Sequence, residues 1–368
     1  MEMSKDPGKF KALIGLDGFV DEILCAVDKR HSTESFTKIP TISAFAERVS
    51  RAAGLSTNIE FVGTTRKLGG NGPIMANALA EQGVSVSCIG AFGEEAVHPV
   101  FQPLKEKCKE FISIAEPGMS FCPEFEDGKL ILSKPGSMNG ITWEALKEKI
   151  GIEKLTAMIS DPELNLFGLE NWTMLPYMSG IFEGIINEVF PLMKPGNCLA
   201  FFDLADPEKR PVSDLSEALK LIMKFSERFR TVLGVNLKEA AQVAEALGID
   251  VKLPGGSPEE ADYEELTVKI GEALGIYCFV IHMVRDACAW SGGKYSCARG
   301  YYTPKPKLTT GAGDNFNAGL CLGLMMGLPI EEALGFGTAS SGFYVREARS
   351  AGFAELTDFI KNGKSDER

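Results

Sequence analysis

The sequence predicts an α/β fold with a doubly wound core, a mostly parallel central sheet and a small separate β-sheet. Three observations point to this fold. Short apolar runs alternate along the chain with helical patterns, which is typical of strands buried on both faces of a parallel sheet. Several of the helical patterns end at a glycine. Two further segments have strand-like composition but do not fit this alternation, which favours a second sheet.

The core strands are expected where apolar residues run almost without interruption. These runs are Ala12–Leu16, Val84–Gly90, Ala157–Ile159, Cys198–Leu204, Thr231–Val235 and Phe279–Val284. Helices are expected between them, where apolar residues recur three and four positions apart. These segments are Pro73–Gln82, Trp143–Ile150, Phe182–Phe190, Leu215–Phe229, Leu237–Leu247 and Tyr263–Leu274. Gly83, Gly248 and Gly275 follow three of them, where a glycine commonly ends a helix.

The second sheet is expected from about residues 20–28, 58–68 and 120–133. Asn58–Leu68 and Ser120–Ser133 have the composition of antiparallel strands, and the latter contains Asp127-Gly128, a strong hairpin signal. A small sheet projecting from an α/β core is a natural lid over a substrate. Because both of its faces carry apolar residues, we expect one face to cover the substrate and the other to form a homodimer. Residues 1–368 would then form one domain with a lid.

Composition and charge exclude several functional classes. Hydrophobic residues make up 45% of the 368 residues and charged residues 24%, as in ordinary globular proteins. With 38 basic and 50 acidic side chains and no long basic run, nucleic acid is not an expected partner. The most apolar stretch, Ala318–Ile330, is about thirteen residues long, too short to span a bilayer. Nine scattered cysteines and an N-terminus without an apolar stretch predict a reduced, cytoplasmic protein.

The most informative motif is Thr309-Thr310-Gly311-Ala312-Gly313-Asp314, which leads into an amphipathic helical run over residues 315–327. Small residues at the start of a helix leave its first N–H groups open to an anion, and the helix dipole adds partial positive charge. Asp314 stands directly beside these groups, where a carboxylate can take a proton from a hydroxyl during phosphoryl transfer. The alternative is a tight turn followed by an acidic first helical turn.

The motif TTGAGDNFNAG resembles the C-terminal signature of the ribokinase-like (PfkB) carbohydrate kinase family. A second signature of that family is similar to Leu68-Gly69-Gly70-Asn71-Gly72, followed by PIMANALAEQG and VSVSCIGAFG. The resemblance extends from about Ala12 to the final helices. It implies a three-layer αβα core with a β-sheet lid. It also implies a kinase that uses ATP and Mg²⁺ to phosphorylate a hydroxyl of a small sugar or nucleoside.

The resemblance also implies roles for individual residues. Asp314 matches the family's catalytic base, and Gly311, Ala312 and Gly313 match the anion hole under the γ-phosphate of ATP. Asn236-Leu237-Lys238-Glu239 resembles the family's N-x-x-E motif, so Glu239 is expected to bind Mg²⁺ through water. The motif follows a predicted strand, at the sheet edge where ligands of such folds bind. The alternative is a helix cap made by Asn and Glu. The expected nucleotide-binding residues are Asn236, Glu239, Thr310 and His282.

The substrate is expected to contact the first predicted strand and the Gly-Gly turn. Relatives place a sugar-binding Asp soon after a glycine in that strand. Asp21 is the better match, although its spacing from Gly15 is one residue long, and Asp17 is the alternative. A solvated turn carboxylate is the alternative for either. Gly70 and Asn71 are the other expected substrate contacts, while Asp203 either lines the site or is structural.

Three departures from the family pattern leave the sugar and the nucleotide open. Ile74 stands where many sugar kinases carry Asn, His282-Met283-Val284 where many carry Thr-Leu-Gly, and Leu308 where an Asp is usual. Arg66 and Lys67 are either a solvated pair or a contact for a phosphate already on the sugar. The alternatives are therefore a nucleoside or sugar-phosphate kinase, or a catalytically silent sugar- or nucleotide-binding protein on this fold. ADP as the donor and a monovalent cation such as K⁺ also remain open.

Overall fold

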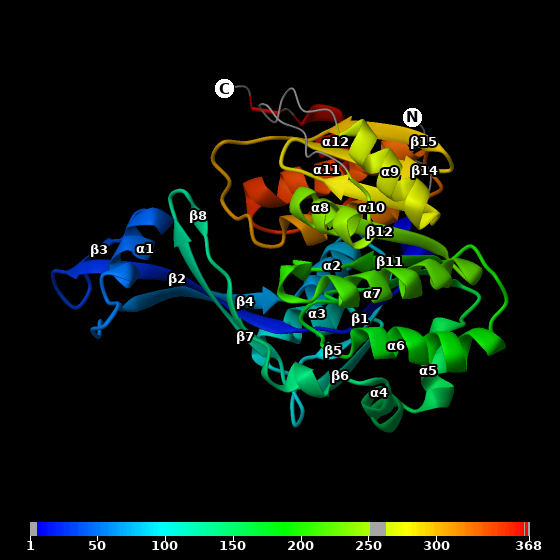
Figure 1. Cartoon of the computed structure of the whole chain (residues 1–368), viewed down its shortest axis with the longest axis horizontal. Coiled ribbons are helices and arrows are strands. Elements are labelled where there is room, and N and C mark those ends of the chain that lie inside the picture. Colours follow the sequence, from blue (N-terminus) through cyan, green and yellow to red (C-terminus); the bar gives the residue numbers. More distant parts are fainter. Residues whose placement is uncertain (1–5, 251–262, 364, 367–368) are drawn as a thin grey trace.

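The computed structural model describes residues 6–250, 263–363 and 365–366. Its main feature is a nine-stranded central sheet (Figure 1). The strands, in spatial order, are β15 (Lys294–Arg299), β14 (Asp286–Ser291), β13 (Cys278–His282), β12 (Arg230–Asn236), β11 (Leu199–Asp203), β10 (Leu164–Leu169), β1 (Lys11–Gly15), β5 (Ser85–Ala91) and β6 (Glu110–Ala115). The seven strands from β13 to β6 are parallel, and β14 and β15 add an antiparallel hairpin at one edge.

Five of the six predicted core strands are present, and the prediction for Ala157–Ile159 is wrong. Those residues end helix α5 (Ile152–Ile159), in which Leu155 and Ile159 are buried four positions apart. That spacing places both side chains on one face of a helix. A run of three apolar residues cannot distinguish a strand from such a face. The real strand, β10, begins five residues after this helix ends.

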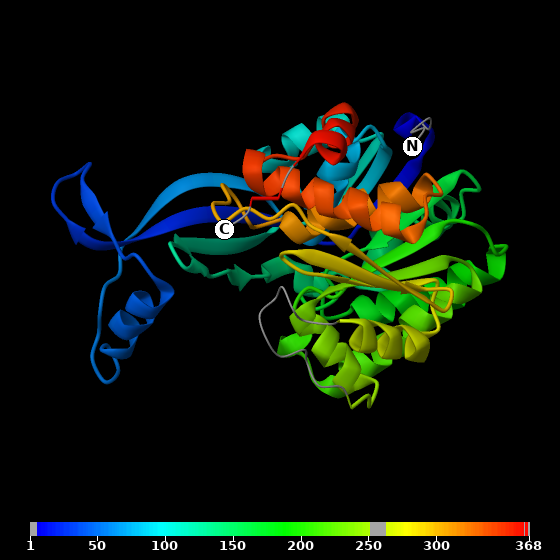
Figure 2. The same cartoon turned by 90° about the horizontal axis from the view of Figure 1, so that it is seen from above.

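Helices cover both faces of the central sheet, so the core has three layers. Figure 2 shows the two groups of helices on opposite sides of the sheet. One face packs against α2 (Asn71–Glu81), α3 (Gln102–Lys107), α10 (Ala312–Met325), α11 (Ile330–Glu347) and α12 (Phe353–Asn362). The other packs against α4 (Trp143–Ile150), α5, α6 (Met178–Gly184), α7 (Val212–Lys224), α8 (Leu237–Ala246) and α9 (Glu264–Leu274). No helix in these described ranges is long and apolar enough to cross a membrane.

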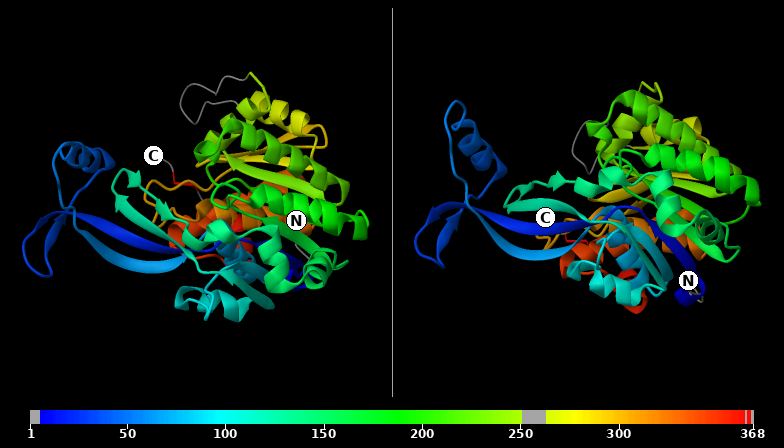
Figure 3. Two further views of the ribbon diagram at one scale, coloured as in Figure 1. Left: turned by 60° about the horizontal axis from the view of Figure 1, so that its bottom comes forward. Right: turned by 90° about the horizontal axis from the view of Figure 1, so that it is seen from below.

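The second sheet projects from the core, and Figures 1 and 3 show it extending away from the helices. Its strands are β3 (Phe36–Lys38), β2 (Phe19–Arg30), β4 (Phe61–Gly69), β7 (Gly118–Phe125), β8 (Gly128–Lys129) and β9 (Leu132–Lys134). Strand β2 pairs with β4 in antiparallel and with β7 in parallel orientation. The predicted turn at Asp127-Gly128 joins β7 to β8. The sequence analysis did not predict β3 or helix α1 (Ile42–Ser50), which lie at the far end of β2.

The topology brings the ends of several strands to one edge of the central sheet. From β1 the chain continues through β5 and β6 on one side, and later through β10 to β13 on the other. Ligands of open α/β sheets bind where the strand order reverses in this way, beyond the carboxyl ends of the strands. The residues at these ends are Asp17, Glu170, Asp203, Asn236 and His282. The small sheet leaves the core at the same edge, because β2 follows β1 almost directly.

Candidate active site

The start of helix α10 is shaped by glycine. Gly311 caps the helix with φ 98°, a left-handed conformation that favours glycine. A Cβ atom there would lie 2.9 Å from the hydroxyl oxygen of Tyr344 and 3.2 Å from a side-chain carbon of Ile74. The N–H of Ala312 donates to the carbonyl of Thr309 at 3.2 Å. The first N–H groups of a helix lack partners within the helix, so this end is suited to an anion.

Asp314 lies in the first turn of α10 and is only 7% exposed. The side-chain amide of Asn71, in the first turn of α2, donates to its Oδ1 at 3.0 Å. Burial, and secondarily the charge of Asp17, raise the pKa of Asp314 to about 8, while Lys67 and Asn71 act in the opposite direction. A carboxylate with this pKa is a suitable general base near neutral pH.

Asp17 builds the turn that carries Asn71. Its carboxylate accepts the backbone N–H groups of Asn71 and Gly72, each at 2.9 Å, and the side-chain amide of Asn171 at 2.7 Å. It thus caps helix α2, whose first N–H groups would otherwise lack partners. Gly70 has φ 94°, and a Cβ atom there would lie 2.8 Å from Asp17 Oδ2. Burial raises the pKa of Asp17 to about 6, although its hydrogen bonds oppose the shift.

Asp21 lies on β2, two pairing positions along the strand from Gly69 of the Gly-Gly turn. It is buried, and it stands opposite Lys67 in the antiparallel pairing of β2 with β4. Burial raises the pKa of Asp21, while Lys67 and the hydroxyl of Ser120 counteract the rise. Its carboxylate also lies against Gly69, where a Cβ atom would collide with it. The structure therefore brings Asp17, Asp21 and the Gly-Gly turn together, but only Asp17 is used to cap the helix.

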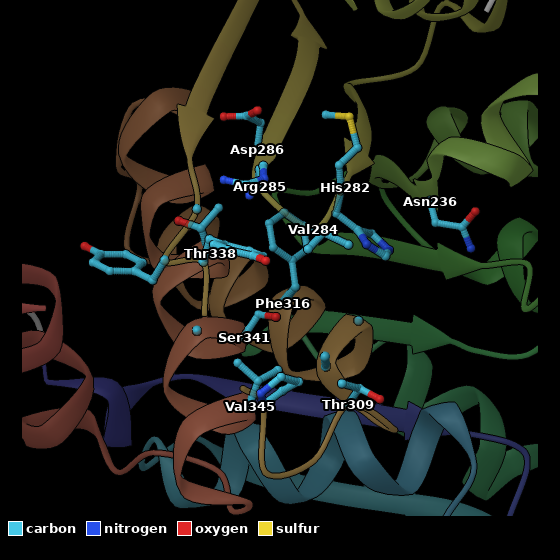
Figure 4. Close-up of a pocket in the computed structure, with 18 of the residues that line it drawn as sticks. Asn236, His282, Val284, Arg285, Asp286, Thr309, Phe316, Thr338, Ser341 and Val345 are labelled. Carbon is cyan, nitrogen blue, oxygen red and sulfur yellow. The ribbon is translucent and has the colours of Figure 1, made fainter. Parts of the chain in front are cut away.

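A cavity of about 700 Å³ lies on the other side of the α10 N-terminus. Ala312 and Gly313 line it, together with Thr309. In Figure 4, Asn236 and His282 come from strand ends on one side, and residues of α11 face them from the other. The α11 residues are Thr338, Ser341, Gly342 and Val345.

The four expected nucleotide-binding residues do not all reach this cavity. Asn236 and His282 line it. Thr310 is buried on the side of the small sheet, where its hydroxyl accepts a bond from Lys129 at 2.6 Å. Glu239 is buried and is not among the residues that line the cavity.

The imidazole of His282 lies beside the first turn of α10. Its ring lies 5.2 Å from that of Phe316, and a Cβ atom on Gly313 would be 3.3 Å from its Cε1. Burial lowers the pKa of His282 to about 4, so the imidazole is neutral at physiological pH. A neutral imidazole offers one hydrogen-bond donor and one acceptor to a ligand in the cavity.

The N-x-x-E segment forms a reciprocal helix cap. Asn236 Oδ1 accepts the N–H of Glu239 at 3.0 Å, and Glu239 Oε2 accepts the N–H of Asn236 at 2.8 Å. The other carboxylate oxygen of Glu239 accepts the N–H of Asp206 at 2.7 Å. In the described parts of the chain, no group of three or more His, Cys, Asp or Glu side chains could hold a metal ion. Glu239 belongs to no such group among the described residues, so a direct metal site does not form around it. The second lone pair of each of its oxygens remains able to accept a bond from a metal-bound water.

Sequence reasoning missed Glu170, which directly follows β10. Glu170 is fully buried, and neither of its carboxylate oxygens has a hydrogen-bond partner among the described residues. Burial, with the nearby charges of Asp203, Asp314 and Asp17, raises the pKa of Glu170 far above its usual range. This shift favours the protonated form of its carboxyl group. The sequence did carry a signal for it, a Glu-Asn pair directly after the apolar run of β10. This signal was missed because the strand was predicted at Ala157–Ile159 instead.

Asp203 belongs to the same buried group. It accepts bonds from Asn317 at 3.1 Å and Asn71 at 3.4 Å, so it joins α10 to the Gly-Gly turn. Arg210 stacks on the ring of Trp172, with its guanidinium carbon 4.0 Å from the ring centre. Trp172 is fully buried in the hydrophobic core. Asn317, a buried polar residue in the second turn of α10, was a second signal for this site.

Arg66 and Lys67 separate onto opposite faces of β4, as neighbours in a strand must. Arg66 is exposed and pairs with Glu22 at 3.2 Å. Lys67 points inward, and its ammonium group donates to the carbonyl of Thr310 at 3.0 Å. The solvated-pair interpretation therefore describes Arg66 alone.

The three-layer core and the small sheet define a ribokinase-like fold. With the carboxylate beside a helix N-terminus and the family match that follows, the chain is a ribokinase-like (PfkB) carbohydrate kinase, which uses ATP to phosphorylate a sugar hydroxyl. Residues 2–363 match the model of the prokaryotic ketohexokinase family, and the chain belongs to that family. A ketohexokinase from Haloferax volcanii is 26% identical over 351 residues, which cover 95% of this chain and 90% of that protein.

Solved structures of sugar kinases share the fold. The 2-dehydro-3-deoxygluconokinase of Thermotoga maritima superposes with a TM-score of 0.65 at 15% identity, over 96% of this chain and 100% of that one. The ribokinase of Thermotoga maritima gives a TM-score of 0.61 at 17% identity, over 96% and 99% of the two chains. These likenesses confirm the predicted ribokinase-like fold.

Proposed function

We propose that this kinase transfers the γ-phosphoryl group of ATP to a primary hydroxyl of a ketohexose such as fructose. The family and the Haloferax volcanii relative carry the name ketohexokinase, which supports this substrate class. One geometric observation carries the proposal. Gly313 and Asp314 are neighbours, yet Gly313 lines the large cavity while Asp314 is bonded to Asn71 in the Gly-Gly turn. A donor in the cavity and an acceptor at the turn would therefore meet at the α10 N-terminus.

In this proposal Asp314 takes the proton of the attacking hydroxyl. Its bond from Asn71 orients the carboxylate, and its pKa of about 8 makes the ionised form a stronger base than an ordinary carboxylate, with the ionised fraction rising toward pH 8. The N–H groups of Gly311 and Gly313, and that of Ala312 once it leaves the Thr309 carbonyl, stabilise the negative charge on the transferring phosphoryl group. His282 and Asn236 contact the nucleotide from the cavity wall. Catalysis then rests on positioning and electrostatics rather than on a covalent intermediate.

We assign the sugar hydroxyls to Asp21, Gly70 and Asn71. Asp17 is less suited to this role because three N–H donors of the chain already occupy its carboxylate. It instead holds the turn in place. Ile74, close to Gly311, presents an apolar surface where many sugar kinases carry Asn. This difference favours a sugar pose that relies on Asp21 and Asn71 for polar contacts.

Mg²⁺ would offset the negative charge of the ATP phosphates, and Glu239 would contact it only through water. Both Glu239 oxygens already accept backbone N–H groups, which supports this indirect role. The residues near the cavity that fit a phosphate-bound cation through water are Asn236 and Glu239. A requirement for K⁺ can be tested by replacing K⁺ with choline in the kinase assay.

We propose that residues 1–368 act as one ribokinase-like domain whose small sheet is the lid, from about residues 20–28, 58–68 and 120–133. Exposed apolar side chains on this sheet support a homodimer through it. They are Phe61, Phe121, Ile131 and Leu132. Light scattering at micromolar concentration should give about twice the chain mass of 39.8 kDa, and a mass near 39.8 kDa would contradict the dimer. The nine free cysteines support a reducing, cytoplasmic location.

The proposal is tested by ADP release from ATP with a panel of ketohexoses, aldohexoses, sugar phosphates and nucleosides. We expect the highest kcat/KM with a ketohexose, loss of activity when Mg²⁺ is chelated, and no activity with ADP as donor. Replacing K⁺ by choline measures any need for a monovalent cation. A kcat/KM at least tenfold higher for a nucleoside or a sugar phosphate would overturn the ketohexose assignment.

A further inference from the structure

Two lysines of the small sheet converge on Thr310, the residue directly before the α10 N-terminus. Lys67, on β4, donates to the Thr310 carbonyl at 3.0 Å and lies 3.4 Å from the Tyr344 hydroxyl. Lys129, on β8, donates to the Thr310 hydroxyl at 2.6 Å. Tyr344 itself donates to the Thr310 carbonyl at 2.7 Å. Two strands of the small sheet, 62 positions apart, thus place ammonium groups on one core residue.

This arrangement is electrostatically unfavourable as it stands. Burial lowers the pKa of Lys67, and burial together with the charge of Lys67 lowers the pKa of Lys129 to about 8. Asp21 and Asp314 favour the charged form of Lys67, but within the described part of the chain neither lysine forms an ion pair with a carboxylate. Two partly buried cations held by neutral oxygen atoms are stabilised when an anion binds between them.

The position of the lysines indicates which anion this is. A Cβ atom on Gly311 would lie 2.9 Å from the Tyr344 hydroxyl, which is also next to the Lys67 ammonium group. The lysines therefore border the start of α10, where helix N–H groups also attract negative charge. Asp314 contributes to the electrostatic environment of both lysines, which places them on the side of the proposed base.

We propose that Lys67 and Lys129 bind the phosphoryl group as it passes from ATP to the sugar, so that the small sheet supplies part of the catalytic charge. This inference rests on the proposed function. The bond from the γ-phosphorus to the ADP oxygen breaks, a bond to the sugar oxygen forms, and the hydroxyl proton goes to Asp314. Both lysines stay protonated and exchange no proton. Their bonds to Thr310 hold them in place until the phosphoryl group replaces these contacts.

The lysine contacts also couple the position of the small sheet to catalysis. Lys129 lies in the short strand after the Asp127-Gly128 turn, at the end of a hairpin, so its ammonium group reaches Thr310 only while that hairpin lies against the core. Closure would then exclude water and deliver positive charge in one step. The phosphoryl group is best stabilised only in the closed arrangement.

The test compares Lys67→Met, Lys129→Met and Lys129→Arg with the parent enzyme. Lys134→Met is the matched control, because Lys134 is an exposed lysine on β9 of the same sheet. Each Met variant should lower kcat about 10²-fold, while KM for ATP changes less than about threefold. Lys129→Arg should retain more activity and extend it to higher pH, because arginine stays charged. Lys134→Met should match the parent.

A binding measurement separates this role from a structural one. Calorimetry with ADP, Mg²⁺, aluminium fluoride and the sugar measures the affinity for a planar mimic of the transferring phosphoryl group. Calorimetry with ADP alone measures the affinity for the nucleotide. We expect the Met variants to lose affinity for the mimic at least tenfold and to keep ADP affinity and Tm. The pH dependence of the Lys129 variants also reflects the charged and titratable groups that face Lys129. These are Lys67, Cys122, Glu124 and Asp314.

Three outcomes would overturn the inference. The first is a Met variant with parental kcat, and the second is unchanged affinity for the aluminium fluoride complex. The third is a higher KM for a sugar phosphate with unchanged kcat, which would assign the lysines to a phosphate already on the substrate. An inactive parent enzyme, by contrast, would reject the proposed function itself before the lysines are tested.

Discussion

The side-chain amide of Asn71 donates to Oδ1 of Asp314 at 3.0 Å, and this bond joins the first turns of α2 and α10. The two residues are 243 positions apart in the chain. Asp17 fixes the turn before α2, while Gly311 fixes the start of α10. The position of the Gly-Gly turn relative to Asp314 therefore depends on the N-termini of α2 and α10, which meet at one edge of the central sheet.

We predict that kcat/KM falls as pH decreases below about 8. The folded-state pKa of Asp314 is raised to about 8, chiefly by burial, so the base becomes protonated below that value. Each further pH unit should then cost about tenfold in rate. A kcat/KM profile measured from pH 5.5 to 9 on the free enzyme checks this. A profile that is flat from pH 6 to 8 would contradict the assignment of the base.

We predict that Asn71→Ala lowers kcat/KM at pH 7 by about tenfold or more, since hydrogen bonds to charged groups contribute about 1.5–3 kcal/mol. The bond from Asn71 lowers the pKa of Asp314, so its loss should shift the acidic limb to higher pH. Asn77→Ala is the matched control on the same helix, because Asn77 bonds to Ser350 instead. An unshifted acidic limb in Asn71→Ala would show that this bond does not tune the base.

We predict that two glycine substitutions in the anion hole separate stability from turnover. Gly311→Ala forces alanine into φ 98° and places its Cβ atom 2.9 Å from Tyr344, so it should cost about 1–3 kcal/mol of unfolding free energy as well as activity. Gly313→Ala meets only His282, at 3.3 Å, so the fold should be kept while the added methyl group lowers kcat about tenfold or more. Urea unfolding measures the stability of each variant, and steady-state kinetics measure its turnover. Equal losses of stability in the two variants would contradict the prediction.

We predict that Glu170→Gln stabilises the fold at alkaline pH. The folded-state pKa of Glu170 is raised, so the unfolded chain releases this proton first and stability falls as pH rises above the unfolded-state value. Gln removes this dependence with almost the same shape. The gain in unfolding free energy should be larger at pH 8 than at pH 5, with exposed Glu183→Gln as control. A gain that is equal at both pH values would mean that Glu170 is not a buried acid.

The fold was largely predictable because buried parallel strands and their helices have distinct apolar patterns. Phe201 and Phe202 illustrate this, since both faces of β11 are buried. The strand after α5 was misplaced because β10 contains Asn165 and Gly168, whereas the apolar end of α5 looked like a strand. Helix α1 was missed because none of its residues is buried, so no packed face marks it in the sequence.

The site was predictable only where local backbone chemistry dictates residue type. Gly311 and Asp314 stand out because a helix start that binds an anion needs small residues beside its acid. Lys129 and Glu170 have no such local pattern. Their places depend on long-range contacts, namely the hairpin that reaches Thr310 and the strand order around β1.

The most direct test of the account is Asp314→Asn, assayed by ADP release with ATP and a ketohexose. Asn is almost the same shape but cannot accept the proton, and loss of a general base costs about 10²–10⁴-fold in kcat. We predict a loss of this size with unchanged Tm and unchanged ATP affinity by calorimetry. A kcat within a few-fold of the parent would remove Asp314 from the mechanism.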